Sequence, residues 1–165
     1  MVNTKSNRSI IRTCPSSIAT MLLGTYPAKF ASGHRVAVPS MLRKNLGNTF
    51  ILARWYEGCL VLIDQEGWSA LYKRLVGEER LVVTPVRDTE RFILAQAFEV
   101  SPDEQGRIVI PEILIEYSQF REDIYFIGVG DRVEIWSKDL WEAKEKEVVE
   151  NAASYIEELA NKNGH

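Results

Sequence analysis

The chain has few of the residues that build metal sites, disulfide frameworks or membrane spans. Its two cysteines and two histidines stand far apart, without metal-ligand spacing. These residues are Cys14, Cys59, His34 and His165. No apolar run in the sequence approaches the roughly 18 residues that cross a bilayer. We therefore expect no metal, no disulfide scaffold and no membrane partner.

Signatures of catalysis are also missing. No nucleophile stands beside a base, no glycine-rich loop could cradle the phosphates of a cofactor, and no pair of acids recurs along the chain. We therefore expect no enzyme, no catalytic residue, no cofactor and no small-molecule substrate.

The net charge of −3 conceals an uneven distribution. Residues 1–20 carry three basic groups and no acid, residues 21–80 carry eight basic and five acidic groups, and residues 81–165 carry nine basic and eighteen acidic groups. Phosphate binding depends on the field over one face of a protein. An anionic partner is therefore expected on the amino-terminal half.

Residues 1–20 are polar and lack hydrophobic periodicity, which predicts a disordered basic arm. A secretory signal is the competing interpretation, because Lys5, Arg8 and Arg12 precede an apolar stretch at 18–23. That stretch is short and is interrupted by Thr20. Translation from Met21 would remove the arm alone.

One pattern occurs twice, 72 residues apart. The segment 31–39, ASGHRVAVP, reappears at 103–111 as DEQGRIVIP, and the alignment continues for about 33 residues without a gap. This period exceeds the roughly 20–50 residues of solenoid repeats. The sequence therefore predicts one small unit that has been duplicated and fused, and whose activity the chain performs twice.

Each repeat predicts short strands closed by one helix, a mainly β fold with helices (α+β). In the second repeat, strands are expected at 97–101, 108–110, 124–129 and 133–136, with a turn at 130–131. A helix should begin near Lys138 after Ser137, and Asp64 should cap its counterpart in the first repeat.

Two further helices are expected outside the repeats. Asp88 or Thr89 can cap a short helix that runs through Phe92 and Ile93 to Ala97 and links the repeats. At the carboxyl end, Trp141, Val148, Ala152, Tyr155 and Leu159 follow an approximate heptad in an acidic segment. This helix either covers the chain's own sheet or binds a neighbouring subunit with its outer turns.

The loop before the strand 108–110 has a defined chemistry. Asp103 can accept hydrogen bonds from backbone N–H groups and from Arg107, while Gly106 supplies a positive φ. One interpretation is a loop staple. The other is a DNA reader, because an ordered guanidinium can form two hydrogen bonds with guanine or clamp a phosphate.

These motifs resemble the MraZ family of bacterial transcriptional regulators. The resemblance rests on Met21-Leu22-Leu23-Gly24-Thr25-Tyr26, on the loop Asp103-x-x-Gly106-Arg107-x-x-Ile110-Pro111, and on 128–137, and it extends from Met21 to about Glu150. It implies tandem SpoVT/AbrB-type domains in a swapped-hairpin, double-split β-barrel. The expected divisions are an arm (1–20), a first domain (21–80), a linker helix (81–95), a second domain (96–143) and a helical extension (144–165).

The resemblance also implies a function. The family implies ring-shaped homo-oligomers that bind repeated sites in the promoter of the division and cell-wall gene cluster, with Arg35 and Arg107 on the DNA. We expect repression by promoter occlusion, including the protein's own gene, in the cytoplasm at the nucleoid. The alternative is an oligomeric scaffold or antitoxin-like interaction protein of the same superfold with reduced DNA binding.

The first loop departs from the family pattern, because Ala31 replaces aspartate and His34 replaces glycine. Arg35 is therefore expected to lack a tether. His34 would need a positive φ if the turn were retained, so we expect Gly33 to shift the turn by one residue. His34 is then either a bystander or a phosphate contact.

Local charge favours the first repeat as the main DNA face. Its cations are expected without local acids, whereas Glu99, Asp103 and Glu104 surround Arg107, whose loop is expected to be chiefly structural. The DNA-binding candidates are Arg35, Arg107, Lys29, Arg43, Lys44 and His34; the loop-structuring candidates are Asp103, Gly106 and Gly33.

Overall fold

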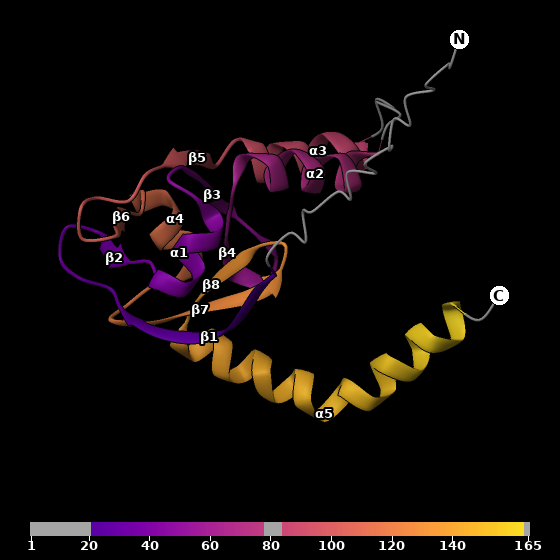
Figure 1. Ribbon diagram of the computed structural model, residues 1–165. Helices are drawn as coiled ribbons and strands as arrows, with labels where there is room; N and C mark the ends of the chain where they lie inside the picture. Colours follow the sequence, from indigo (N-terminus) through magenta and orange to yellow (C-terminus); the bar gives the residue numbers. More distant parts are fainter. Residues whose placement is uncertain (1–20, 78–83, 164–165) are drawn as a thin grey trace, which may run out of the picture.

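A computed structural model describes residues 21–77 and 84–163 (Figure 1). The predicted arm, Cys14 and His165 lie outside these described residues. The strands are β1 (Leu22–Lys29), β2 (Arg35–Ala37), β3 (Phe50–Arg54), β4 (Leu60–Ile63), β5 (Ala97–Val100), β6 (Arg107–Val109), β7 (Asp123–Gly130) and β8 (Val133–Ser137). The helices are α1 (Ser40–Leu46), α2 (Gln65–Val76), α3 (Thr84–Leu94), α4 (Glu112–Ser118) and α5 (Lys138–Asn163), with a 3-10 turn η1 at Tyr56–Gly58. This mixture of antiparallel strands and helices confirms the predicted α+β class.

The two repeats exchange strands. Six strands form one sheet in the order β1-β7-β8-β4-β3-β5, and β2 and β6 form a separate two-stranded ribbon. Strand β1 of the first repeat pairs with β7 of the second, from Leu22 opposite Gly130 to Lys29 opposite Asp123. In the same way, β5 of the second repeat pairs with β3 of the first. Neither repeat therefore builds its sheet alone.

Alternation along the strands divides the buried side chains between two cores. In β7, Ile124 and Phe126 face a first core, while Tyr125 and Ile127 face a second core on the other side of the sheet. The first core also contains Val36, Leu42, Ile108 and Leu114. The second contains Ile63, Leu71, Ile93 and Trp136, and lies against α2, α3 and the start of α5. Both sheet faces are thus covered where the two repeats meet.

The helices begin where local chemistry favours it. Asp64 accepts a hydrogen bond from the Gly67 N–H at 2.6 Å, which confirms the predicted cap of α2. The linker helix α3 begins at Thr84, so the prediction of a cap at Asp88 or Thr89 was wrong. The helix ends at Leu94, before the predicted end at Ala97, which is the first residue of β5. Pro85 explains the earlier start, because proline suits the first turn of a helix.

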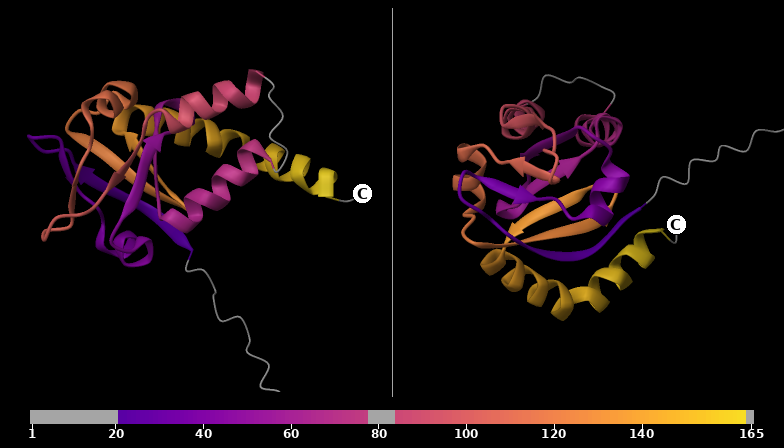
Figure 2. Two further views of the ribbon diagram at one scale, coloured as in Figure 1. Left: turned by 90° about the horizontal axis from the view of Figure 1, so that it is seen from above. Right: turned by 60° about the vertical axis from the view of Figure 1, so that its left-hand side comes forward.

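The long helix α5 begins at Lys138, as predicted. Its first turns cover the outer face of the sheet, and the rest extends away from the body, whereas α2 and α3 lie together on another side (Figures 1 and 2). No helix among the described residues is long and apolar enough to cross a membrane.

Candidate nucleic-acid interface

The β2–β6 ribbon brings together one arginine from each repeat. Arg35 lies opposite Val109, and Arg107 lies opposite Ala37. Between them, the opposed pair Val36 and Ile108 is buried. Since side chains alternate across a strand, Arg35 and Arg107 share the outer face. They are diagonal neighbours, at the roughly 7–8 Å that this geometry gives.

The two loops that precede these strands are closed by the same backbone hydrogen bond. We call residues 31–34 loop 1 and residues 103–106 loop 2. The Ala31 N–H donates to the Arg35 carbonyl at 2.9 Å, and the Asp103 N–H donates to the Arg107 carbonyl at 2.8 Å. Each loop also accepts a hydrogen bond from the other repeat, His34 O from the Ile110 N–H and Gly106 O from the Val38 N–H. The loops are therefore held side by side.

Loop 1 keeps its register although histidine has replaced glycine. His34 has φ +59°, close to the +76° of Gly106, and Gly33 is also positive at +75°. The predicted one-residue shift of the turn was therefore wrong. The reason is that a slip by one residue would exchange the inner and outer faces of β2 and bury Arg35. The imidazole of His34 stacks on Phe30, with ring centroids 6.3 Å apart and an interplanar angle of 8°.

Asp103 tethers Arg107 in loop 2, as the staple interpretation predicts. Its Oδ1 accepts from the backbone N–H groups of Gln105 and Arg107, each at 2.9 Å. Its Oδ2 accepts from Arg107 Nε at 2.9 Å and lies 2.8 Å from Nη2. These hydrogen bonds, led by that of the Arg107 backbone, lower the pKa of the Asp103 carboxyl. Arg107 is thus presented in one orientation.

Arg35 has no such tether. Ala31 occupies the position of Asp103, and Arg35 is exposed with no ion pair or side-chain hydrogen bond to any residue that the structure describes. The expectation of an untethered Arg35 is confirmed. The two repeats therefore present one untethered and one tethered guanidinium on the same face.

Arg43 and Lys44 accompany loop 2, although they belong to the first repeat. They extend from α1 and line a hollow of about 460 Å³ together with Pro102, Asp103, Glu104 and Gly106. The Arg43 guanidinium lies against Gly106, whose φ of +76° is what the turn requires of glycine. The predicted grouping of these cations around loop 1, away from acids, was wrong. Strand exchange carries α1 to the other loop.

Lys29 also differs from that expectation. Its Nζ lies 2.6 Å from Asp123 and 3.2 Å from Glu122, two acids of the second repeat that the pairing of β1 with β7 brings to the end of its strand. Asp123, followed by Glu122, raises the pKa of the Lys29 ammonium. Its charge is therefore shared with two carboxylates, in contrast to that of Arg35.

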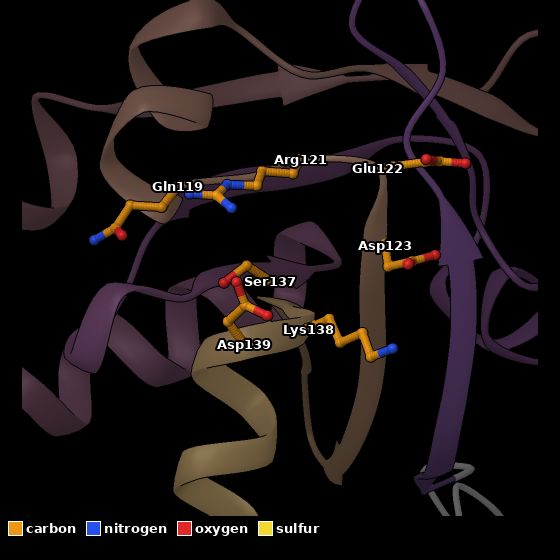
Figure 3. Close-up of a pocket in the computed structure, with 7 residues that line it drawn as sticks. All are labelled: Gln119, Arg121, Glu122, Asp123, Ser137, Lys138 and Asp139. Atoms are coloured by element: carbon orange, nitrogen blue, oxygen red, sulfur yellow. The ribbon is translucent and has the colours of Figure 1, made fainter.

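A second hollow, of about 170 Å³, lies at the amino-terminal end of α5 (Figure 3). Its cations Arg121 and Lys138 share the lining with Glu122, Asp123 and Asp139. This mixture of charges gives no net attraction for phosphate. No group of three or more potential metal-ligating side chains occurs within the ranges 21–77 and 84–163.

Comparison with known proteins gives independent evidence on the family of this chain. A model of the family described as "MraZ protein, putative antitoxin-like" matches residues 93–163. The "Transcriptional regulator MraZ" of Caldanaerobacter subterraneus subsp. tengcongensis is 37% identical over 148 residues, which cover 87% of this chain and 99% of that protein. The protein of the same name from Acetivibrio thermocellus is 38% identical over 145 residues, 85% of this chain and 97% of the relative. That of Oenococcus oeni is 35% identical over 146 residues, 86% and 98% respectively.

These matches span almost the whole length of the relatives, and at 85–87% of this chain they must include both loops. Together with the paired loops and the shared sheet, they lead to one conclusion: the chain belongs to the MraZ family.

Proposed function

We propose that this protein binds double-stranded DNA with the outer face of the β2–β6 ribbon and thereby regulates transcription. The observation that carries the proposal is the placement of Arg35 and Arg107, from different repeats, as neighbours on one exposed face. The major groove admits a two-stranded ribbon, and a guanidinium can form two hydrogen bonds with guanine O6 and N7. The name of the relatives, transcriptional regulator, agrees with this function.

The two arginines contribute differently. Arg107 is held by Asp103, so little side-chain entropy is lost when it meets a base edge, at the expense of part of its charge. Arg35 keeps its full guanidinium for a phosphate or a base. In this proposal both loops form the contact surface, and neither dominates it. Arg107 sets the register on the DNA, and Arg35 adapts to the groove.

Arg43 and Lys44 flank this surface as phosphate contacts beside loop 2. Each phosphate contact releases counterions, so these residues contribute to the salt dependence of binding but not to base preference. Lys29 contributes less, because Asp123 and Glu122 already hold its ammonium. His34 stacks on Phe30 at the tip of loop 1. In this proposal it lies beside the path of the DNA backbone.

The biological setting follows the family resemblance. In this proposal, the protein acts in the cytoplasm at the nucleoid, as a ring-shaped homo-oligomer on repeated sites in the promoter of the division and cell-wall gene cluster. Binding several sites at once raises the effective concentration of each ribbon. Occupied repeats exclude polymerase and repress the cluster, including the protein's own gene.

The first test is binding to a fluorescent duplex from the region upstream of the gene, with a scrambled duplex of equal length as the control, at several salt concentrations. We expect tighter binding of the upstream duplex and an affinity that falls steeply with salt. Equal affinity for the two duplexes would refute sequence-specific DNA binding. Absence of binding at low salt by an intact oligomer supports the scaffold or antitoxin-like alternative.

The second test locates the surface. Arg35→Ala and Arg107→Ala should each cost about 1–3 kcal/mol, or roughly 5- to 150-fold in affinity for the upstream duplex. Arg91→Ala on α3 is the matched control, because it removes the same charge far from the loops, where Arg91 pairs with Asp88. A loss with Arg91→Ala equal to those of the loop variants would reject the ribbon as the contact surface.

A further inference from the structure

The outer face of the β2–β6 ribbon carries two apolar side chains beside its two arginines. Since side chains alternate along a strand, Ala37 lies on the same face as Arg35, and Val109 lies on the same face as Arg107. Both apolar side chains are exposed, and the exposed fraction of Val109 is 53%. The face that we propose to meet DNA therefore consists of two guanidinium groups and two apolar groups.

Each arginine lies directly opposite an apolar residue of the other repeat. Arg35 is paired with Val109, and Arg107 is paired with Ala37. At the next residue beyond each pair, a backbone N–H of one strand donates to a carbonyl of the other. The two pairs are therefore of the non-hydrogen-bonded kind, in which opposing side chains come closest, with Cβ atoms about 4.5–5.5 Å apart.

The packing of the protein itself does not use the Val109 side chain. On the inner face of the ribbon, Val36 and Ile108 are 1% and 0% exposed and belong to the first core. In the part of the chain that the structure describes, neither core contains Val109. Its isopropyl group is thus available to a ligand of the outer face.

The major groove of DNA offers such a side chain one suitable partner. The base edges there present hydrogen-bond donors and acceptors, and a single apolar group, the C5-methyl of thymine. An apolar side chain against a donor or acceptor leaves that group without water and without a partner, which weakens binding. Against the thymine methyl, both surfaces gain from leaving water. The apolar groups of the ribbon therefore match thymine.

We propose that Val109 determines part of the sequence specificity by contacting a thymine methyl group in the major groove, beside the contact made by Arg35. Ala37 makes the smaller, equivalent contact beside Arg107. This inference rests on the proposed binding of DNA by the ribbon, and it adds a second kind of readout. Successive bases of one strand are about 3.4 Å apart, so side chains about 5 Å apart reach bases within about two base pairs of each other.

The two halves of the ribbon differ in how they read DNA. Hydrophobic stabilisation is roughly proportional to the apolar area removed from water, so Val109, with two methyl groups, contributes more than Ala37, with one. Val109 accompanies the untethered Arg35, whereas Ala37 accompanies Arg107, which Asp103 holds in place. Thymine preference is therefore stronger in the half with the untethered arginine, and the other half depends more on hydrogen bonds.

The first test removes the methyl groups from the DNA. Deoxyuridine lacks only the C5-methyl of thymidine and forms the same pair with adenine. The upstream duplex is therefore prepared with deoxyuridine in place of every thymidine, and its affinity is compared with that of the thymine duplex by fluorescence anisotropy at one salt concentration. Burial of one methyl group is worth roughly fourfold in affinity, so we expect the wild-type protein to bind the uracil duplex about fourfold more weakly or worse.

The second test removes the apolar group from the protein. Val109→Ser should lower the preference for the thymine duplex to about twofold or less, and Val109→Ala should give an intermediate preference. Val149→Ser is the matched control, because Val149 is 70% exposed on α5, which runs away from the ribbon (Figure 1). It should keep the full preference. Thermal unfolding checks that the variants are folded, and Val109→Ala alone suffices if Val109→Ser does not fold.

Three results would count against the proposal. Equal affinity of the wild-type protein for the thymine and uracil duplexes overturns it, and leaves the proposed DNA-binding function intact if the scrambled duplex still binds more weakly. A thymine preference that the folded Val109 variants retain in full also overturns it, because strand propensity alone would then account for the valine. Absence of binding to either duplex at low salt refutes the proposed function, and this inference with it.

Discussion

Replacing Gly128 by alanine tests the exchange of strands between the two repeats in the six-stranded sheet. Gly128 lies in β7 opposite Gly24 of β1. A side-chain carbon there would lie 2.5 Å from the Leu23 nitrogen, 2.6 Å from the Leu22 carbonyl carbon and 2.8 Å from its oxygen. These are backbone atoms, so they cannot give way unless β1 separates from β7. Only glycine fits where the strands cross this closely.

The size of the effect follows from the clash. Adding a methyl group to a well-packed site costs about 1–3 kcal/mol, and the upper end applies here because the neighbours are backbone. We therefore expect Gly128→Ala to lower the free energy of unfolding by about 3 kcal/mol. For a chain of this size, each kcal/mol lowers Tm by roughly 2–4 °C, so Tm should fall by about 6–12 °C.

Gly47→Ala is the control, measured in the same thermal and urea unfolding experiments. Gly47 has φ +85° and ψ −149°, a region that essentially only glycine populates, with nothing within 4 Å of the added carbon, so alanine there meets a backbone penalty of about 1–3 kcal/mol and no clash. Gly128 lacks this penalty, because its φ is outside the positive range. If Gly128→Ala leaves the free energy of unfolding unchanged, β1 does not pair with β7 in this register.

Three further predictions concern single side chains. Asp103→Asn should destabilise the protein at neutral pH. The folded-state pKa of Asp103 is lowered, so its contribution to stability is present above the unfolded pKa of about 3.9 and disappears as the pH falls through the folded pKa. The stabilities of wild type and variant should therefore converge when unfolding is measured at acidic pH. Ala31→Asp should give loop 1 the missing tether and stabilise the protein by about 1 kcal/mol, and an unchanged urea midpoint would contradict the equivalence of the loops. Burial raises the pKa of the Cys59 thiol, so in a Cys14→Ser background a thiol reagent at pH 8 should label the protein only after unfolding; rapid labelling of the native protein would contradict its burial.

Several features could be predicted from local sequence because they depend on neighbours along the chain. The Asp64 cap, the start of α5 at Lys138 and the Asp103–Arg107 staple each involve groups within four residues of one another. The loop pattern at 103–111 also indicated the family. For the same reason, Pro85 was an available signal for the true start of α3 that the prediction did not use.

The partners of the cations could not be predicted in this way. Periodicity indicates that a strand is half buried, but it does not say which strand lies beside it. Lys29 meets Asp123 only because β1 pairs with β7, and Arg43 meets Gly106 only because α1 follows a strand of the shared ribbon. Charge counted along the chain therefore missed the acids that pair with Lys29 and placed Arg43 at the wrong loop.

By itself, the sequence determined that this protein consists of two related β units, that one loop carries a tethered arginine and that the other lacks the tether. Only the tertiary structure decided that Arg35 and Arg107 lie on one face, that His34 retains the turn with a positive φ, and that the outer turns of α5 expose their apolar residues. The physical reason is that tethers and caps are contacts within one turn of chain, whereas the shared face arises from hydrogen bonds between strands about 72 residues apart.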